Sequence, residues 1–342
     1  MKRNPGDMLI FILKRIGLMF FLLIGTTFIV FVLSHMMLPD PAVVWAGRHA
    51  SHSEITAIVA EYHLNAPFYT QYYYYMKGIL TGNWGTNTIN GAPILPELLH
   101  YFPATLELVL ASLLIMMAVG IPLGVIAASR QGKTADHIVR ALYLSGWATP
   151  TFLGGVILVL IFGLYIRILP DTGMINPSLT PPPTITGMPV VDSLLALNFT
   201  DFVSSVRHLI LPAVSLAFLN FGITTRMTRS SMLEVLSLDY IKAARSKGLA
   251  ESVVLFKHVL RNALTSTVTV LALMTGSLLS GTVVIEEIFG WPGIGTFAYN
   301  SIVVSDFPAI IGVTIFFAAG VIIANLIADV LYAVLDPKVE WG

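Results

Sequence analysis

The sequence predicts an all-α integral membrane protein with about six transmembrane helices. Of its 342 residues, 56% are hydrophobic and 11% are charged, whereas soluble domains have about 25% charged residues. Apolar stretches long enough to cross about 30 Å of hydrocarbon as helices recur along the chain. Six such stretches lie near residues 10–38, 102–128, 141–166, 207–226, 264–288 and 308–335. We expect them to form one transmembrane domain over residues 1–342.

The first apolar stretch imitates a secretory signal peptide but is too long for one. It follows basic pairs at positions 2–3 and 14–15 and runs over residues 16–38. A signal peptide has an apolar core of about 7 to 15 residues. We therefore interpret this stretch as a retained first span.

The basic residues give the spans an orientation. Cytoplasmic loops of membrane proteins are enriched in Lys and Arg. With a cytoplasmic N-terminus, 15 of the 19 basic residues lie inside, and the outer side keeps Arg48, Lys77, Arg167 and Arg207. We predict a multi-pass protein of the cell membrane, embedded in the lipid bilayer, with both termini in the cytoplasm.

Residues 40–100 are expected to form a small helical cap on the extracellular side. Ser51 and Glu54 are placed as a capping box before a stretch with the apolar spacing of an amphipathic helix. Pro67 suits the first turn of a second short helix. The other long outer segment, 167–206, is rich in Pro and is predicted to be an irregular, stiff loop.

The segment 227–262, between the fourth and fifth spans, is too long for a simple hairpin. Asp239 is placed to cap a helix over Tyr240–Lys247, and Gly248 suits the left-handed residue that ends it, with Leu249 as the hydrophobic contact. A second short helix is predicted over Glu251–Leu260. The two helices would make an elbow parallel to the membrane, although the composition also fits a basic amphipathic segment on anionic lipid.

This elbow resembles the cytoplasmic EAA loop of ABC-importer permeases. The family pattern is Glu-Ala-Ala, three residues, Gly, nine residues, then Ile-x-Leu-Pro. The residues that fit it here are Ala243, Ala244, Gly248 and Leu260, and those that depart from it are Lys242, His258 and Arg261. The fuller wording, DYIKAARSKGL followed by KHVLRNAL, is similar to the dipeptide, oligopeptide and nickel importer subfamily.

The resemblance extends over nearly the whole chain. The similar segments are PATLELVLAS at 103–112, GIPLG at 120–124, ILPDTG at 168–173, LILPAVSLAF at 209–218, EEIFGWPGIG at 286–295 and DVLYAVLDPKV at 329–339. Their order and spacing together support a permease subunit of a binding-protein-dependent importer.

The resemblance implies a chain that works with several partners. These are a second, similar permease subunit, two cytoplasmic ABC ATPase subunits, and an extracellular or periplasmic substrate-binding protein that delivers peptides, nickel chelates or oligosaccharides. The elbow is expected to dock in a cleft of the ATPase, and ATP and Mg²⁺ to bind there rather than in this chain. By the family pattern, the ATPase-coupling residues are Asp239, Tyr240, Ala243, Ala244, Arg245, Lys247, Gly248 and Leu249.

We expect no catalytic residue, no bound metal and no nucleic-acid partner. The sequence GKT at 132–134 resembles the end of a phosphate-binding loop, but Ala127 stands where that motif needs Gly. The chain has no Cys, its eight His residues form no H-E-x-x-H motif, and its formal net charge is zero.

Polar residues in or near the spans are candidates for the solute pathway or for contacts between helices. They are Glu107, Asn220, Asn325 and Asp329. We favour interhelical hydrogen bonds, or pairing with a cytoplasmic Arg, over contact with solute.

The turn at 286–295 has two interpretations. It is either an interfacial hairpin anchored by Phe289 and Trp291, or an outer gate or binding-protein contact formed by Glu286, Glu287, Phe289 and Trp291.

An ion-coupled secondary transporter is the alternative function. Such transporters place discontinuous helices and ionisable groups near the membrane midplane. The central parts of these spans are poor in charged residues, which disfavours this alternative.

Overall fold

The computed structural model describes residues 5–36, 41–46 and 50–335. This part of the chain is built of helices and contains no β-strand, only an isolated bridge between Thr86 and Pro93. The prediction of an all-α protein is confirmed.

Five helical segments of the described chain are long and apolar enough to cross a membrane. They are Ile12–His35 in α1 (Pro5–Met36), α5 (Ile94–Ser129), Phe199–Phe218 in α9 (Phe199–Leu236), Glu251–Ile288, and Phe307–Leu331 in α14 (Phe307–Leu335). The segment Glu251–Ile288 joins α11 (Glu251–Val253), the π-helical η2 (Val254–Leu260) and α12 (Arg261–Ile288).

The predicted span at 141–166 is not one straight helix. It is divided between α6 (Thr134–Ala148) and the helical pair α7 (Thr151–Leu158) and η1 (Val159–Tyr165), which is π-helical, with a bend of 109° between the two arms. Pro150 lies at the break, where it has no N–H to donate and disfavours helical geometry at Thr149. The described spans thus number five, or six if this bent pair is counted as one.

The Pro-rich segment 167–206 is more helical than predicted. It contains α8 (Pro189–Leu195), and α9 begins at Phe199, before the predicted start at 207. Asn198 caps α9 by accepting a hydrogen bond from the backbone N–H of Asp201. The polar residues Asp201, Ser204 and Ser205 interrupt the apolar pattern in these first turns.

Helices α5 and α9 pack closely along their length. A Cβ atom on Gly120 would lie 2.8 Å from Cβ of Thr224, and one on Gly124 would lie 2.5 Å from Cβ of Thr228. Small residues permit this approach of two backbones in a membrane bundle. The motif GIPLG at 120–124 therefore has a packing role.

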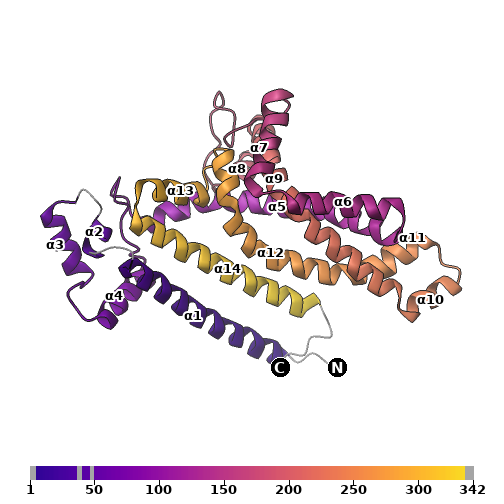
Figure 1. Cartoon of the computed structure of the whole chain (residues 1–342), viewed down its shortest axis with the longest axis horizontal. Helices are drawn as coiled ribbons and strands as arrows, with labels where there is room; N and C mark the ends of the chain where they lie inside the picture. The colour runs from indigo at the N-terminus through magenta and orange to yellow at the C-terminus, as the bar shows by residue number, and fades with distance from the viewer. Residues whose placement is uncertain (1–4, 37–40, 47–49, 336–342) are drawn as a thin grey trace.

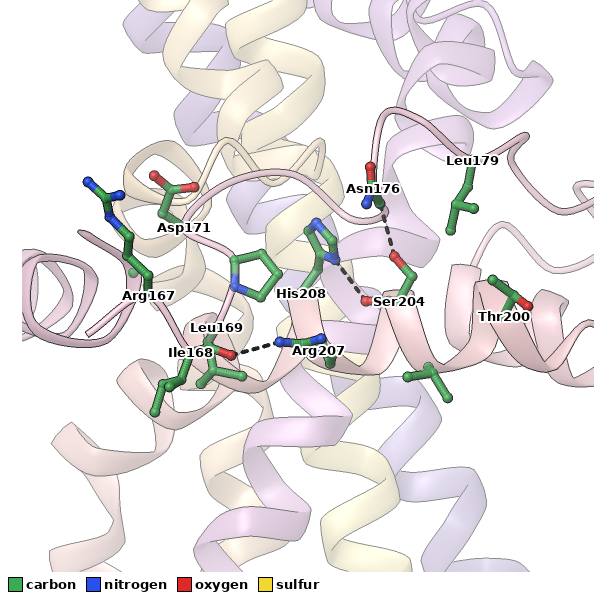
Figure 2. A pocket seen from close by; sticks show the side chains of 13 residues that line it. Arg167, Ile168, Leu169, Asp171, Asn176, Leu179, Thr200, Ser204, Arg207 and His208 are labelled. Carbon is green, nitrogen blue, oxygen red and sulfur yellow. Dashed lines mark hydrogen bonds between the residues drawn. The ribbon is translucent and has the colours of Figure 1, made fainter. Parts of the chain in front are cut away.

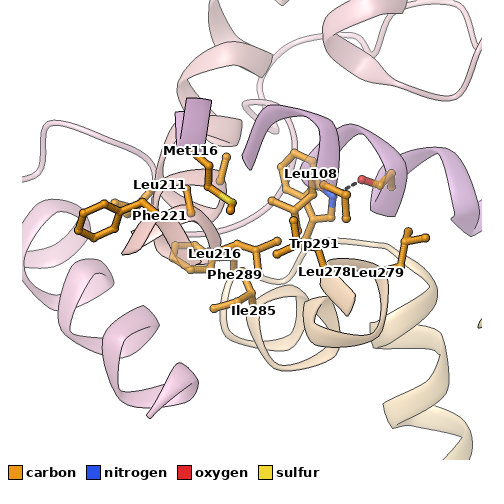
Figure 3. Close-up of a cluster of buried hydrophobic side chains, with 14 of the residues drawn as sticks. Leu108, Met116, Leu211, Leu216, Phe221, Leu278, Leu279, Ile285, Phe289 and Trp291 are labelled. Atoms are coloured by element: carbon orange, nitrogen blue, oxygen red, sulfur yellow. Dashed lines mark hydrogen bonds between the residues drawn. The ribbon is translucent and has the colours of Figure 1, made fainter. Parts of the chain in front are cut away.

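The main buried cluster joins α5, α9, α12 and the turn after α12 (Figure 3). Its largest members include Leu108, Met116, Leu211, Leu216, Ile285, Phe289 and Trp291. Helices α1, α14 and α12 run side by side, with α14 between the other two (Figure 1). Arg15 of α1 and Asp329 of α14 form an ion pair at 2.9 Å.

The predicted cap consists of α2 (Pro41–Ala46), α3 (His52–Glu61) and α4 (Phe68–Thr81), at the end of the molecule opposite α10 (Asp239–Ser246) (Figure 1). The predicted capping box is confirmed, since Ser51 N–H donates to Glu54 and Glu54 N–H donates to Ser51 Oγ. Pro67 precedes α4 as its N-cap instead of lying in its first turn. Aromatic residues of α4 pack on Phe31 of α1.

Candidate functional site

The elbow is a short helix, α10, followed by a turn and the long helical segment 251–288. Ile241 anchors α10, because its side chain is completely buried with Met232, Val254 and Val259. The predicted end of the second short helix, at Leu260, is wrong, because the helical segment that begins at Glu251 continues into α12. The elbow is thus attached directly to a span.

Gly248 ends α10 as predicted, in the left-handed conformation with φ of 77°. Its N–H donates to Arg245 O at 2.9 Å, and Leu249 N–H donates to Ala244 O at 3.5 Å, which are the two bonds of a Schellman motif. A Cβ atom at Gly248 would meet no atom within 4 Å. Glycine is therefore favoured by the backbone angle and not by lack of space.

Asp239 does not cap α10 as predicted. The N-cap residue is Leu238, and Asp239 lies in the first turn, where it accepts a hydrogen bond from Lys242 Nζ at 2.8 Å. A carboxylate in the first turn still interacts favourably with the helix dipole.

The outer face of the elbow exposes apolar side chains and charge. Tyr240, Leu249 and Phe256 are exposed, Phe256 by 60%. Asn262 donates to the Tyr240 hydroxyl at 2.7 Å, and Arg245 pairs with Glu251 at 2.6 Å. The other predicted coupling residues on this face are Ala243 and Lys247, which are exposed, and Ala244, which is half-buried. Such a face suits docking of another protein.

A buried ion pair beside the elbow was missed by the sequence reasoning. Asp136 of α6 is fully buried, and it accepts hydrogen bonds from Nε and Nη2 of Arg229 at 2.8 and 2.9 Å and from Gly132 N–H at 2.9 Å. This bidentate contact joins α6 to α9. The available signal was an acidic residue between Lys133 and Arg140 in an otherwise basic segment.

The turn after α12 is buried at the opposite end of α5. Glu286 is completely buried and accepts hydrogen bonds from Thr105 Oγ1 at 2.7 Å and Thr296 N–H at 3.1 Å. Thr105 Oγ1 accepts from Ile294 N–H at 2.8 Å, and Trp291 Nε1 donates to Ala104 O at 2.9 Å (Figure 3). These bonds join α5, α12 and α13 (Ile294–Val304).

Two glycines permit this turn. A Cβ atom on Gly293 would overlap the Glu286 carboxylate and the Thr105 hydroxyl, and one on Gly295 would lie 2.5 Å from Cα of Val283. The motif EEIFGWPGIG is therefore a tightly packed junction between helices.

Both interpretations of this turn need correction. Phe289 and Trp291 are each 1% exposed, so they are core residues and not interfacial anchors. With Glu286, they have no surface for direct contact with a binding protein in this conformation of the chain. Glu287 is exposed and keeps its predicted role as a contact. A gate formed by the turn also stays a prediction.

The predicted polar residues of the spans do not meet at one site. Glu107 accepts a hydrogen bond from Val190 N–H at 2.9 Å, Asn220 donates to Leu216 O of its own helix at 2.9 Å, and Asn325 is exposed. Asp329 pairs with Arg15, as the favoured interpretation predicts. Glu107 and Asp329 thus make contacts between helices, although Glu107 Oε2 is buried without a hydrogen-bond partner among the described residues.

The loop before α8, whose first turn is bonded to Glu107, is organised by Asp192 of the same helix. Burial raises the pKa of Asp192, but hydrogen bonds from Thr186, Gly187 and Ile185 together hold the pKa below its usual value. The carboxylate is therefore charged at neutral pH and fixes the start of α8. No group of His, Asp and Glu side chains able to hold a metal occurs among the described residues.

Comparison with known proteins identifies the family. Residues 120–341 match the family described as the binding-protein-dependent transport system inner membrane component, and residues 8–116 match its N-terminal family. The chain belongs to this family of ABC-importer permeases. The family consists of membrane permease subunits of importers, and membership supports the importer over the ion-coupled alternative.

Relatives match this permease over nearly its whole length. It is 40% identical over 318 residues to the probable D,D-dipeptide transport system permease protein DdpB of Escherichia coli K12, covering 93% of this chain and 94% of the relative. It is 37% identical to the dipeptide transport system permease protein DppB of the same strain, covering 97% and 99%. The oligopeptide transport system permease protein AppB of Bacillus subtilis 168 is 34% identical, with coverage of 97% and 99%.

We predict that Asp136→Asn destabilises the permease by about 3 kcal/mol, because it leaves Arg229 without a buried counter-ion. Thermal unfolding in detergent would measure the loss. The double variant Asp136→Asn with Arg229→Gln should recover part of it. As a control, Glu251→Gln removes an exposed ion pair and should cost less than about 1 kcal/mol. If Asp136→Asn and Glu251→Gln lower the melting temperature equally, the buried ion pair of Asp136 and Arg229 does not stabilise the permease more than an exposed one.

We predict that Gly293→Ala destabilises the buried turn by about 1–3 kcal/mol through overpacking. Gly281→Ala in α12 is the matched control, since a Cβ atom there would meet nothing within 4 Å. It should be neutral or stabilising by up to about 1 kcal/mol. If both variants melt at the same temperature, the close packing of Gly293 does not limit stability.

Proposed function

We propose that this permease forms half of a translocation pathway for short peptides. The support is that relatives matching nearly the whole chain are named for dipeptide or oligopeptide transport. Oligosaccharides and nickel chelates, which the family resemblance also allows, are the competing substrates. The other half would come from a second, similar permease, and an extracellular or periplasmic binding protein would deliver the solute.

The elbow is the proposed contact with the ATPase. Exposed apolar groups at Tyr240, Leu249 and Phe256 surround a short helix whose buried side is held by Ile241. A stiff element fixed on one side and exposed on the other transmits movement from a partner to the attached span. In this proposal two cytoplasmic ATPase subunits bind ATP and Mg²⁺, and the permease chain hydrolyses nothing.

The proposed orientation places the elbow and both termini in the cytoplasm. The elbow and its flanks carry Arg226, Arg229, Lys242, Arg245, Lys247, Lys257 and Arg261, as expected of a cytoplasmic segment. Helix α1 begins, and α14 ends, away from the cap helices α2–α4 (Figure 1). The cap would then lie outside the membrane.

Transport in proteoliposomes tests the substrate class. The permease would be reconstituted with its partner permease, ATPase subunits and binding protein, and uptake of labelled Ala-Ala, maltotriose and a nickel–histidine chelate would be compared. We expect ATP-dependent uptake of Ala-Ala that unlabelled peptides inhibit. Uptake restricted to maltotriose or the chelate would refute the peptide assignment.

We predict that Gly248→Val lowers both transport and the ATP hydrolysis that is coupled to it. A β-branched residue at positive φ is strained by about 1–3 kcal/mol, which opposes the docked geometry of the elbow. Uptake and substrate-stimulated ATP hydrolysis should fall about fivefold or more. Gly91→Val is the matched control, because Gly91 has φ of 71° and free space around it but lies in the cap region. Full coupled activity of Gly248→Val would disprove the role of the elbow.

A further inference from the structure

A cavity of about 570 Å³ lies between the loop after η1 and the first turns of α9 (Figure 2). Its volume falls within the range of about 300–1,000 Å³ that is usual for small-molecule sites. Apolar side chains of both segments form part of the wall. The polar and charged side chains that line it include Arg167, Asp171, Asn176, Ser204, Arg207 and His208.

Two guanidinium groups at this cavity have no carboxylate partner. Arg167 Nε donates to Leu164 O at 3.1 Å, and Arg207 Nη2 donates to Ile168 O at 2.9 Å. Within residues 5–36, 41–46 and 50–335, neither forms an ion pair. Each guanidinium carries five N–H donors in a planar fork that matches a carboxylate. Most of these donors remain available to a ligand.

The positive charge of the cavity contrasts with the rest of the outer segments. Four basic residues of the whole chain are predicted on the outer side, and Arg167 and Arg207 are two of them. The preference of Lys and Arg for cytoplasmic loops would disfavour basic residues on the outer side, so the presence of both Arg167 and Arg207 at one outer cavity needs another explanation.

His208 adds a polar group at the base of the cavity. Its side chain is 8% exposed, and Nδ1 lies 2.7 Å from Ser204 O. A carbonyl oxygen only accepts, so Nδ1 carries the hydrogen and Nε2 is left for a ligand. Asn176 N–H donates to Ser204 Oγ at 3.0 Å and ties the loop to α9. Figure 2 shows the imidazole between Asp171 and Asn176.

We propose that this cavity binds a short zwitterionic peptide. Arg207 would receive its carboxylate and Asp171 its ammonium group, and Nε2 of His208, the acceptor of the neutral imidazole, would accept a hydrogen bond from an N–H of the peptide. An acidic side chain of a docking protein would need only the guanidinium groups. A zwitterionic peptide would also use Asp171, through its ammonium group, and the apolar wall, through its side chains, so we favour the peptide. The inference rests on the peptide-importer function proposed above, and it adds a binding site on the outer side of the permease.

Saturation-transfer NMR on the assembled complex in nanodiscs, without binding protein, tests the site. The probes are Ala-Ala and Ala-Ala amide, which lacks the carboxylate. We expect Ala-Ala to bind, and amidation or Arg207→Gln each to weaken binding about tenfold or more, because a charge-assisted hydrogen bond is lost. Lys77→Gln, another basic residue predicted outside but absent from the cavity lining, should leave binding unchanged.

Several results would overturn the site. Equal binding of Ala-Ala and its amide, or unchanged binding in Arg207→Gln with a native melting temperature, excludes a carboxylate pocket. If Arg207→Gln reduces affinity for the purified binding protein but not for Ala-Ala, the cavity is a docking surface and the proposal is wrong. If any of these results occurs while the wild-type complex takes up Ala-Ala, the proposed binding site in the cavity is refuted and the proposed function stands. If the wild-type complex takes up no peptide, the proposed function itself is refuted.

Discussion

The close approach of α5 and α9 is the contact on which the other features of the permease depend. Gly120 and Gly124 allow the two backbones to meet at Thr224 and Thr228. In lipid, where apolar surface alone does not drive helices together, such packing is a main source of association. Near one end of this pair Thr105 holds the buried turn, and at the other end α9 leads into the elbow.

The two ends of the α5–α9 pair differ in how their polar groups are satisfied. At the turn, Glu286 and Thr105 are fully buried and are satisfied within the chain. At the elbow, a buried ion pair between Asp136 and Arg229 lies beside an exposed, partly apolar face. The first arrangement favours a fixed junction, and the second favours a stable base with a surface left for a partner.

Sequence reasoning predicted features that depend on local chemistry. Apolar stretches located the spans, Ser51 and Glu54 formed the expected capping box, and Gly248 took the left-handed conformation. These outcomes depend on hydrogen bonds and backbone angles within a few residues. For Asp329 the prediction was pairing with some cytoplasmic Arg, and the sequence alone did not identify Arg15 as the partner.

The features that were missed depend on contacts distant in the sequence. Arg229 lies 93 positions from Asp136, and Thr105 lies 181 positions from Glu286. Single-sequence patterns contain no distance information between such residues, so Trp291 was interpreted as an interfacial aromatic residue instead of a core residue. The bend at Pro150 was overlooked because a hydropathy profile is averaged over many residues. A single residue that interrupts a helix within an apolar stretch therefore leaves the profile almost unchanged.

The segment Glu251–Ile288 has a mechanical consequence, because it is one helical rod of 38 residues. At 1.5 Å per residue it is about 57 Å long, with the elbow at one end and the Glu286 junction at the other. A tilt of about 5° at the elbow would displace the far end by about 5 Å, a lever ratio set by helix length. Because Glu286 is bonded there to Thr105 of α5 and Thr296 of α13, such a tilt would carry these helices along with the far end of the rod.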